Sequence, residues 1–166
     1  MATTKTLNDL FYETLKDIYY AERQILKALP KMARAAQDEK LKAAFLQHKD
    51  ETEGQVDRLK QVFELIGKRA QGKTCDAIEG ILSEGEEIME EFKGTPALDA
   101  GLLAAAQAVE HYEISRYGTL RAWATQLGMK DAATLLGETL AEESKTDELL
   151  SELAETAVNS AAKQAA

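Results

Sequence analysis

The stretch from Phe11 to Met32, FYETLKDIYYAERQILKALPKM, decides the fold. Seven of its side chains follow one another at alternating spacings of four and three residues: Phe11, Leu15, Ile18, Glu22, Ile25, Leu29 and Met32. This is the stripe that an amphipathic helix buries against other helices. Six of the seven are apolar. Glu22 lies in the middle, where a lone carboxylate loses its hydration and must become neutral or find a cation.

The composition favours a single all-helical domain over residues 1–166. A chain of 166 residues, 45% hydrophobic and 30% charged, is typical of one globular domain with a sizeable core. Two prolines and few β-branched residues stand against abundant Ala, Leu, Glu and Lys, which are good helix formers. We therefore expect an all-α fold.

The charge and the cysteine count narrow the partners and the compartment. A net charge of −9 without a Lys/Arg cluster argues against nucleic acid and anionic membrane, because phosphate groups need a positive face. The apolar stretch 97–109 is interrupted by Asp99 and too short to span a bilayer. Cys75 is the single cysteine, which excludes a disulfide within the chain. The N-terminus lacks a continuous apolar signal core, and we expect a cytoplasmic protein.

Capping signals divide the chain into four long helices and one short one. Thr6 with Asp9, Asp38, Thr74 and Thr95–Pro96 are the expected starts, and Gly67 and Gly128 are expected stops. The expected helices are 6–35, 39–66, 75–92, 96–127 and 130–156. The Ala-rich tail 159–166 is expected to fray.

The other three long helices repeat the pattern of the first, apolar at their ends and acidic or polar at mid-length. The second helix has Leu41, Ala44, His48, Glu51, Gln55, Leu59, Val62 and Ile66. The third has Leu103, Ala106, Glu110, Glu113, Tyr117, Leu120, Ala124 and Leu127. The fourth has Leu136, Leu140, Glu143, Asp147, Leu150 and Ala154.

Register predicts that the acidic centres meet. Glu22 and Glu51 are equally far from the first turn, and Glu113 and Glu143 are equally far from Gly128. If the long connection carries the chain back along the bundle, both pairs lie at mid-height. The layer would then contain six carboxylates: Glu22, Glu51, Glu110, Glu113, Glu143 and Asp147.

One glutamate on a buried stripe is most often a boundary residue whose head group reaches water. Four such stripes in register weaken that interpretation, because buried like charges cannot all ionise without a counter-charge. Carboxylates with one imidazole are ligands that divalent Fe or Mn accepts. Two divalent ions would balance four of the six acids, so the remaining acids would be protonated, lie outside the metal shell or meet a more oxidised ion.

The layout resembles the ferritin-like di-iron bundles, which carry a Glu on two helices and Glu-x-x-His on the other two. The segments YYAERQI, HKDETEGQVDRL, VEHYEISRYGTL and LAEESKTDELL resemble the YciE/YciF stress-associated branch of that superfamily, across nearly the whole chain. The resemblance implies a four-helix bundle with a long crossover that carries a short extra helix. It also implies that two Fe or Mn ions bind Glu22, Glu51, Glu110 and Glu143, with Glu113 matching the extra ligand of rubrerythrins.

Both Glu-x-x-His motifs are broken, because Gly54 and Thr146 stand three residues after Glu51 and Glu143. Three side chains could replace the missing ligands, namely His48, Gln55 and Asp147. His48 is equally well interpreted as a hydrogen-bonded core residue. Tyr117 is expected to pack or to hydrogen-bond a ligand carboxylate, whereas His111 and Glu142 are expected to face solvent or a partner subunit.

Two functions remain open at this point. The first is a dinuclear Fe or Mn stress protein that reacts with O2 or peroxide, as the resemblance implies. The second is a non-catalytic structural or stress dimer whose metal site is vestigial or only stabilising. We expect a homodimer in either case, because the connection 74–92 adds apolar side chains that would cap the bundle or contact a second subunit.

Overall fold

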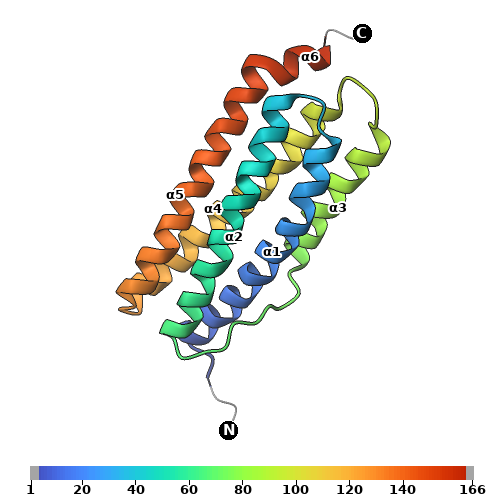
Figure 1. Cartoon of the computed structure of the whole chain (residues 1–166). Helices are drawn as coiled ribbons and strands as arrows, with labels where there is room; N and C mark the ends of the chain where they lie inside the picture. The colour runs from blue at the N-terminus through green and yellow to red at the C-terminus, as the bar shows by residue number, and fades with distance from the viewer. Residues whose placement is uncertain (1–3, 164–166) are drawn as a thin grey trace.

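The computed structural model describes residues 4–163, and this part of the chain is helical without any strand (Figure 1). The helices are α1 (Leu7–Ala35), α2 (Glu39–Leu65), α3 (Asp76–Glu91), α4 (Leu98–Gln126) and α5 (Lys130–Leu153). A π-helical turn, Ala154–Val158, joins α5 to the short α6 (Asn159–Lys163). The predicted all-α bundle with a long crossover and an extra helix is confirmed.

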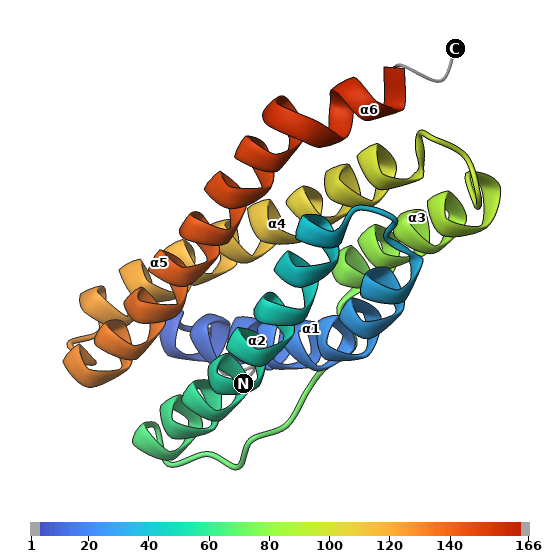
Figure 2. The same cartoon turned by 45° about the horizontal axis from the view of Figure 1, so that its top comes forward.

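Two helical hairpins form the bundle, α1 with α2 and α4 with α5, and they turn at opposite ends of the molecule (Figure 1). The crossover between α2 and α3 carries the chain back along α1, where Lys73 N–H donates to the Lys16 carbonyl at 3.2 Å. Helix α3 packs on α4 and α1, outside the four long helices (Figure 2). This topology brings the middles of α1, α2, α4 and α5 to one level.

The helix starts and stops follow the sequence signals in part. Thr6 and Asp9 form the expected capping box, and Asp38 caps α2. Gly67 and Gly128 adopt φ of 67° and 74°, which glycine adopts without strain. The caps expected for α3 and α4, Thr74 and Thr95, are wrong.

Cys75 rather than Thr74 precedes α3. Helix α4 begins at Leu98, so the cap expected at Thr95–Pro96 is wrong too. The chain makes a turn there first, in which Leu98 N–H donates to the Thr95 carbonyl at 3.3 Å. The two errors move helix bounds by one or two residues and leave the register of the bundle unchanged.

The C-terminal segment is more regular than expected. The chain stays helical through Lys163, because Ala154 and Val158 pack into the core and hold the last turns in place. The fraying predicted for 159–166 is therefore wrong up to Lys163, and 164–166 lie outside the described residues.

Most apolar side chains of helix α3 pack against the core of the same chain. Ile78 is fully buried, and Ile81, Leu82 and Met89 are partly buried against the core, whereas Phe92 is exposed. The helix flanks the bundle and does not cap it, so these side chains no longer argue for a subunit contact. The homodimer stays a prediction.

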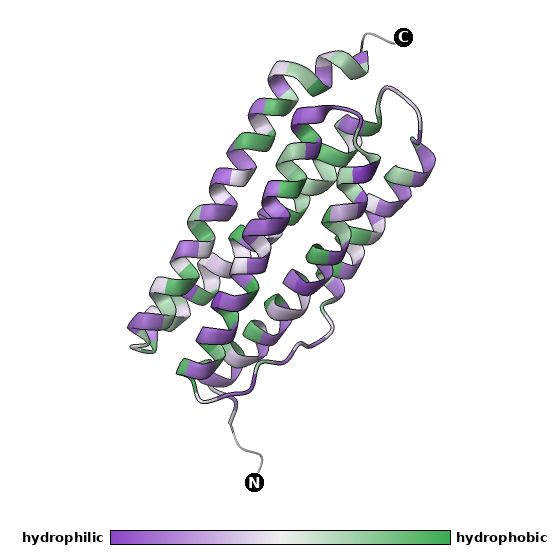
Figure 3. Ribbon diagram, viewed as in Figure 1, coloured by the Kyte–Doolittle hydropathy of each residue, from purple (hydrophilic) through white to green (hydrophobic). Residues whose placement is uncertain are grey.

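Hydrophilic and hydrophobic positions alternate along each helix (Figure 3), and the hydrophobic ones form one continuous core. Within residues 4–163, no helix combines the length and the apolar character that crossing a bilayer requires. The core is interrupted at mid-height by a polar layer.

Candidate metal centre

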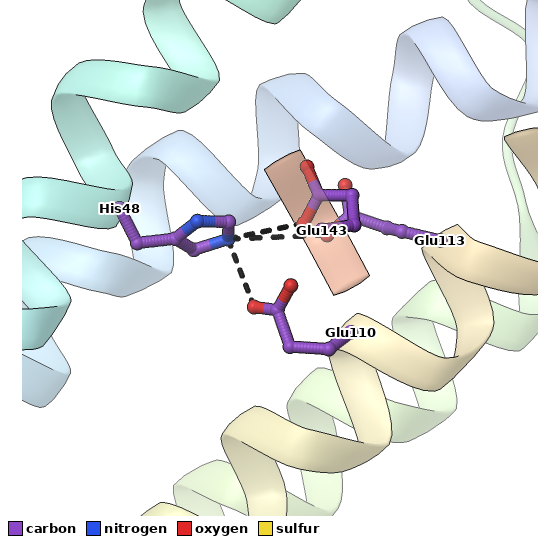
Figure 4. A group of neighbouring side chains, drawn as sticks. All are labelled: His48, Glu110, Glu113 and Glu143. Atoms are coloured by element: carbon purple, nitrogen blue, oxygen red, sulfur yellow. Dashed lines mark ion pairs between the residues drawn. The ribbon is translucent and has the colours of Figure 1, made fainter. Parts of the chain in front are cut away.

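Four side chains of the polar layer meet in the interior of the bundle (Figure 4). His48 comes from α2, Glu110 and Glu113 from α4, and Glu143 from α5. One ligand atom from each lies within 4.8 Å of the others, and all four residues are buried. His48 Nε2 lies 3.0 Å from Glu110 Oε1, 3.8 Å from Glu143 Oε2 and 3.9 Å from Glu113 Oε2. We call these four residues the central cluster.

Most polar atoms of the central cluster have no hydrogen-bond partner among the described residues. They are both carboxylate oxygens of Glu113 and of Glu143, one oxygen of Glu110 and both ring nitrogens of His48. The 3.0 Å contact between His48 and Glu110 lacks hydrogen-bond geometry. Buried polar atoms without partners are rare in native proteins and destabilising. Oxygen and nitrogen donors that converge in this way fit a metal ion.

The electrostatics of the metal-free cluster favour protons where a metal would bring positive charge. Burial, followed by the charges of Glu143, Glu22 and Glu110, raises the pKa of Glu113 well above its ordinary value. Burial and Glu110 raise the pKa of Glu143 in the same way. Burial opposes the charge on His48, but Glu110 and Glu51 outweigh it and raise the pKa of His48 to about 11. Metal binding therefore has to displace protons.

Glu22 of α1 lies next to Glu113 of the central cluster. Its side chain is fully buried, one of its oxygens accepts a hydrogen bond from the Tyr117 hydroxyl, and the other is without a partner in the described part of the chain. Burial raises the pKa of Glu22 to about 7, although Glu113 and Tyr117 act in the opposite direction. Tyr117 therefore holds a candidate ligand in place, one of the two roles expected for it.

Glu51 lies at the edge of the layer, with 33% of its side chain exposed. Its Oε2 is 3.9 Å from His48 Nδ1 and accepts a hydrogen bond from the Thr146 hydroxyl at 3.4 Å. Its other oxygen accepts from the Gln47 amide at 3.0 Å. His48 holds the pKa of Glu51 below its ordinary value. The buried stripe of α2 passes through Thr52 where the sequence pattern favoured Glu51.

Asp147 is not part of the central cluster. It binds the Gln107 amide at 3.3 Å and the His111 ring at 3.1 Å on the outer side of α4 and α5. The buried stripe of α5 is Ala132, Leu136, Thr139, Glu143, Thr146, Leu150 and Leu153. From Glu143 the stripe continues three residues on, to Thr146, and not four residues on, to Asp147. His111 is exposed, as expected.

Gln55 is fully buried, but its amide donates to Glu142 at 3.0 Å. Arg58 holds the same carboxylate from the other side, with contacts of 2.8 and 3.1 Å, and also donates to the Thr139 hydroxyl at 2.7 Å. Glu142 is thus paired within the chain, beside the central cluster, while 35% of its side chain is exposed, so it also meets solvent as expected. The sequence interpretation also missed Thr146, although it occupies the position of the absent histidine.

Comparison with known proteins places the chain in a family. Residues 6–163 match the family described as Domain of unknown function (DUF892). The chain belongs to the DUF892 family. It is 47% identical over 163 residues to Protein YciF of Escherichia coli strain K12, covering 98% of each chain. The resemblance to the YciE/YciF branch of the ferritin-like fold is therefore confirmed.

Solved structures of relatives share the fold. The E. coli stress protein YciF superposes with a TM-score of 0.89 at 47% identity, over 94% of this chain and 99% of that chain. YcfI of Rhodopseudomonas palustris, described as a candidate structural protein, gives 0.87 at 45% identity, over 90% and 96%. A protein of Xanthomonas campestris pv. campestris, 23% identical, gives 0.74 over 96% and 98% and supports the fold alone.

Proposed function

We propose that this chain binds a dinuclear Fe or Mn centre and reacts with O2 or peroxide in stress protection. The observation that carries the proposal is the buried group of donor atoms without partners on Glu113, Glu143, Glu110, His48 and Glu22. A stress role agrees with the description of the relative YciF as a stress protein.

Charge balance supports two divalent ions. In the part of the chain that the structure describes, four carboxylates of the polar layer are fully buried: Glu22, Glu110, Glu113 and Glu143. Ionised, they carry four negative charges, which equal the four positive charges of two divalent ions. Glu51 lies at the solvent edge and Asp147 outside the cluster, which fits the expectation that the surplus acids lie outside the metal shell. His48 would supply a neutral imidazole once its proton has left.

The side chains around the proposed metal centre would orient its ligands and exclude water from it. Metal ions of this type supply electrons to a bound oxidant, and a carboxylate-rich shell stabilises their higher oxidation states. Tyr117 orients Glu22, and Thr146 and Gln47 orient Glu51 at the solvent edge. The apolar core above and below the layer excludes water.

A second candidate function is a non-catalytic structural or stress module with a vestigial or purely stabilising site. The description of the relative YcfI favours it, as does the single histidine in the cluster. Under this alternative the protein would bind metal without consuming an oxidant.

The test is oxidant consumption by metal-loaded protein. We expect anaerobic titration with Fe(II) or Mn(II) to saturate at two ions per chain, and the loaded protein to consume O2 or hydrogen peroxide in repeated turnovers. Glu113→Gln should abolish consumption. Asp147→Asn is the matched control, because it changes an acid outside the cluster and should leave consumption intact. Two bound ions without consumption would favour the structural alternative.

The homodimer is proposed independently of the metal site. Light scattering should give twice the mass of the chain at working concentration and at high dilution. A monomeric mass under both conditions would refute it.

A further inference from the structure

A small apolar cavity adjoins the central cluster on the side of the α1–α2 turn. Its volume is about 10 Å³, close to the minimum that holds one water molecule. All five helices α1 to α5 contribute to its wall. His48, Glu110 and Thr146 supply the polar groups, and the remaining lining side chains are aliphatic, methionine or phenylalanine.

The outer end of the cavity is formed by Ala28 of α1 and Leu82 of α3. These two are the partly exposed residues of its lining, whereas the others are buried. The same two residues line a surface groove between α1 and α3, together with Lys27, Lys31, Glu79 and Glu86. Ala28 and Leu82 therefore separate solvent from an apolar space that ends at two candidate metal ligands.

Contacts on both sides of Leu82 hold α3 over this opening. Glu79, three residues before it, accepts a hydrogen bond from the Tyr20 hydroxyl. Glu86, four residues after it, pairs with Lys31 at 3.2 Å. Both contacts join α3 to α1 near Leu82, and a shift of α3 away from α1 would uncover the cavity.

The lining selects among small oxidants by polarity. A buried water needs two to four polar partners, and hydrogen peroxide likewise needs hydrogen bonds to replace those it makes in water. Here polar groups occupy the cluster end alone, and the rest of the wall offers none. Dioxygen is apolar and diatomic, so it loses no hydrogen bonds on entering such a space.

We propose that dioxygen reaches the central cluster through this cavity, passing between Ala28 and Leu82, and that hydrogen peroxide does not use this route. The proposal rests on the proposed metal chemistry for its purpose and on the cavity itself for its geometry. Dioxygen is then the oxidant that this fold admits.

Xenon tests the cavity without metal, because this apolar atom is larger than water and enters only if the lining moves apart, as the passage of dioxygen between Ala28 and Leu82 also requires. Crystals of the metal-free full chain, pressurised with xenon, should show a xenon peak between Ala28, Leu82 and Ala106. Ala28→Phe should lose that peak, since the larger ring fills the opening. Ala35→Phe is the matched control, because Ala35 is a partly exposed alanine of the same helix outside the lining and should retain the peak. Leu82→Phe serves as a second blocking variant if Ala28→Phe fails to fold.

Stopped-flow oxidation of the metal-loaded protein tests the route. Ala28→Phe should slow reaction with dioxygen about tenfold or more while leaving the rate with hydrogen peroxide unchanged. Equal slowing with both oxidants, or no slowing with dioxygen, would overturn the route, as would the absence of a xenon peak in the native protein. Native protein that binds xenon but consumes neither oxidant would show instead that the proposed function had failed.

Discussion

Two buried carboxylates of helix α4, Asp99 and Glu113, show what burial does and does not reveal. Asp99 accepts the backbone N–H groups of Gln37 at 2.8 Å and Asp38 at 2.6 Å, so it fastens α4 to the α1–α2 turn. Both oxygens of Glu113 lack a partner in the described residues. The hydrogen bonds of the fold account for the burial of the first acid, whereas they leave the second without a partner, as the proposed metal centre would require. Buried carboxylate oxygens and ring nitrogens without a hydrogen-bond partner therefore indicate the candidate site better than burial alone does.

The same contrast holds for neighbouring residues of α5. Glu142 is held by Arg58 and Gln55, whereas Glu143 has neither oxygen satisfied within residues 4–163. The Arg58 guanidinium thus pairs with one acid, whereas the adjacent acid has the His48 ring at 3.8 Å. The two kinds of acid should therefore respond to substitution in opposite directions.

The largest effect is expected at Asp99. Asp99→Ala removes the acceptor of two backbone N–H groups and should lower the free energy of unfolding by about 3–5 kcal/mol. Urea unfolding measures this. Asp131→Ala, which removes an exposed first-turn acid of α5, is the control and should change stability little. Equal losses in the two variants would show that Asp99 does not fasten α4 to the turn.

The metal-free protein should lose stability as pH rises. An ordinary carboxylate in an ion pair has the opposite effect, because it loses its stabilising charge as pH falls. The pKa of Glu22 is about 7 in the fold and 4.5 in the unfolded chain, so the folded state keeps a proton that the unfolded state releases. Between pH 4.5 and 7 the native protein should lose about 3 kcal/mol relative to Glu22→Gln. Urea unfolding across pH with chelator present measures the difference, and parallel curves would contradict it.

Removing a cluster acid should stabilise the metal-free fold. Glu113→Leu replaces a buried, unpartnered carboxyl by an apolar side chain and should raise the free energy of unfolding by about 2 kcal/mol at pH 7. Asp147→Leu should bring no gain, since Asp147 is hydrogen-bonded outside the cluster. A destabilised Glu113→Leu would mean that the carboxyl has a structural partner in the fold.

Tyr117→Phe should have the smallest effect. Loss of the hydroxyl removes one buried hydrogen bond to Glu22 and should lower stability by about 1 kcal/mol. Because that bond lowers the pKa of Glu22, the variant should also need a higher pH for half-maximal metal binding. Tyr19→Phe, whose ring packs edge-on against Phe63, is the control. An unchanged pH profile for Tyr117→Phe would contradict a positioning role.

The sequence predicted the fold and most of the layer for identifiable reasons, since Glu22 and all four residues of the central cluster were among its candidates. On α1 and α4 the four-three stripe is unambiguous, and Glu22, Glu110, Glu113 and Tyr117 are buried as the pattern indicates. On α2 and α5 polar residues occupy adjacent positions at mid-length, so the stripe could continue by three or by four residues. The structure selects Thr52 and Thr146, where the pattern favoured the acids beside them.

Other features depend on tertiary structure and have no local signal. Asp99 could not be recognised as a satisfied buried acid, because its partners lie in a turn about sixty residues earlier in the chain. The apolar stripe of helix α3 predicts a cap or a subunit contact equally well, since it does not specify which neighbour covers it. Its packing on α1 and α4 follows from the path of the crossover.

The central claim is that the unpartnered acids are metal ligands, and metal content tests it most directly. Native protein and the Glu22→Leu, Glu113→Leu double variant should be purified without chelators and analysed by inductively coupled plasma mass spectrometry. We predict two Fe or Mn ions per native chain and loss of most of this metal from the folded double variant. Full metal occupancy in the double variant would contradict the claim.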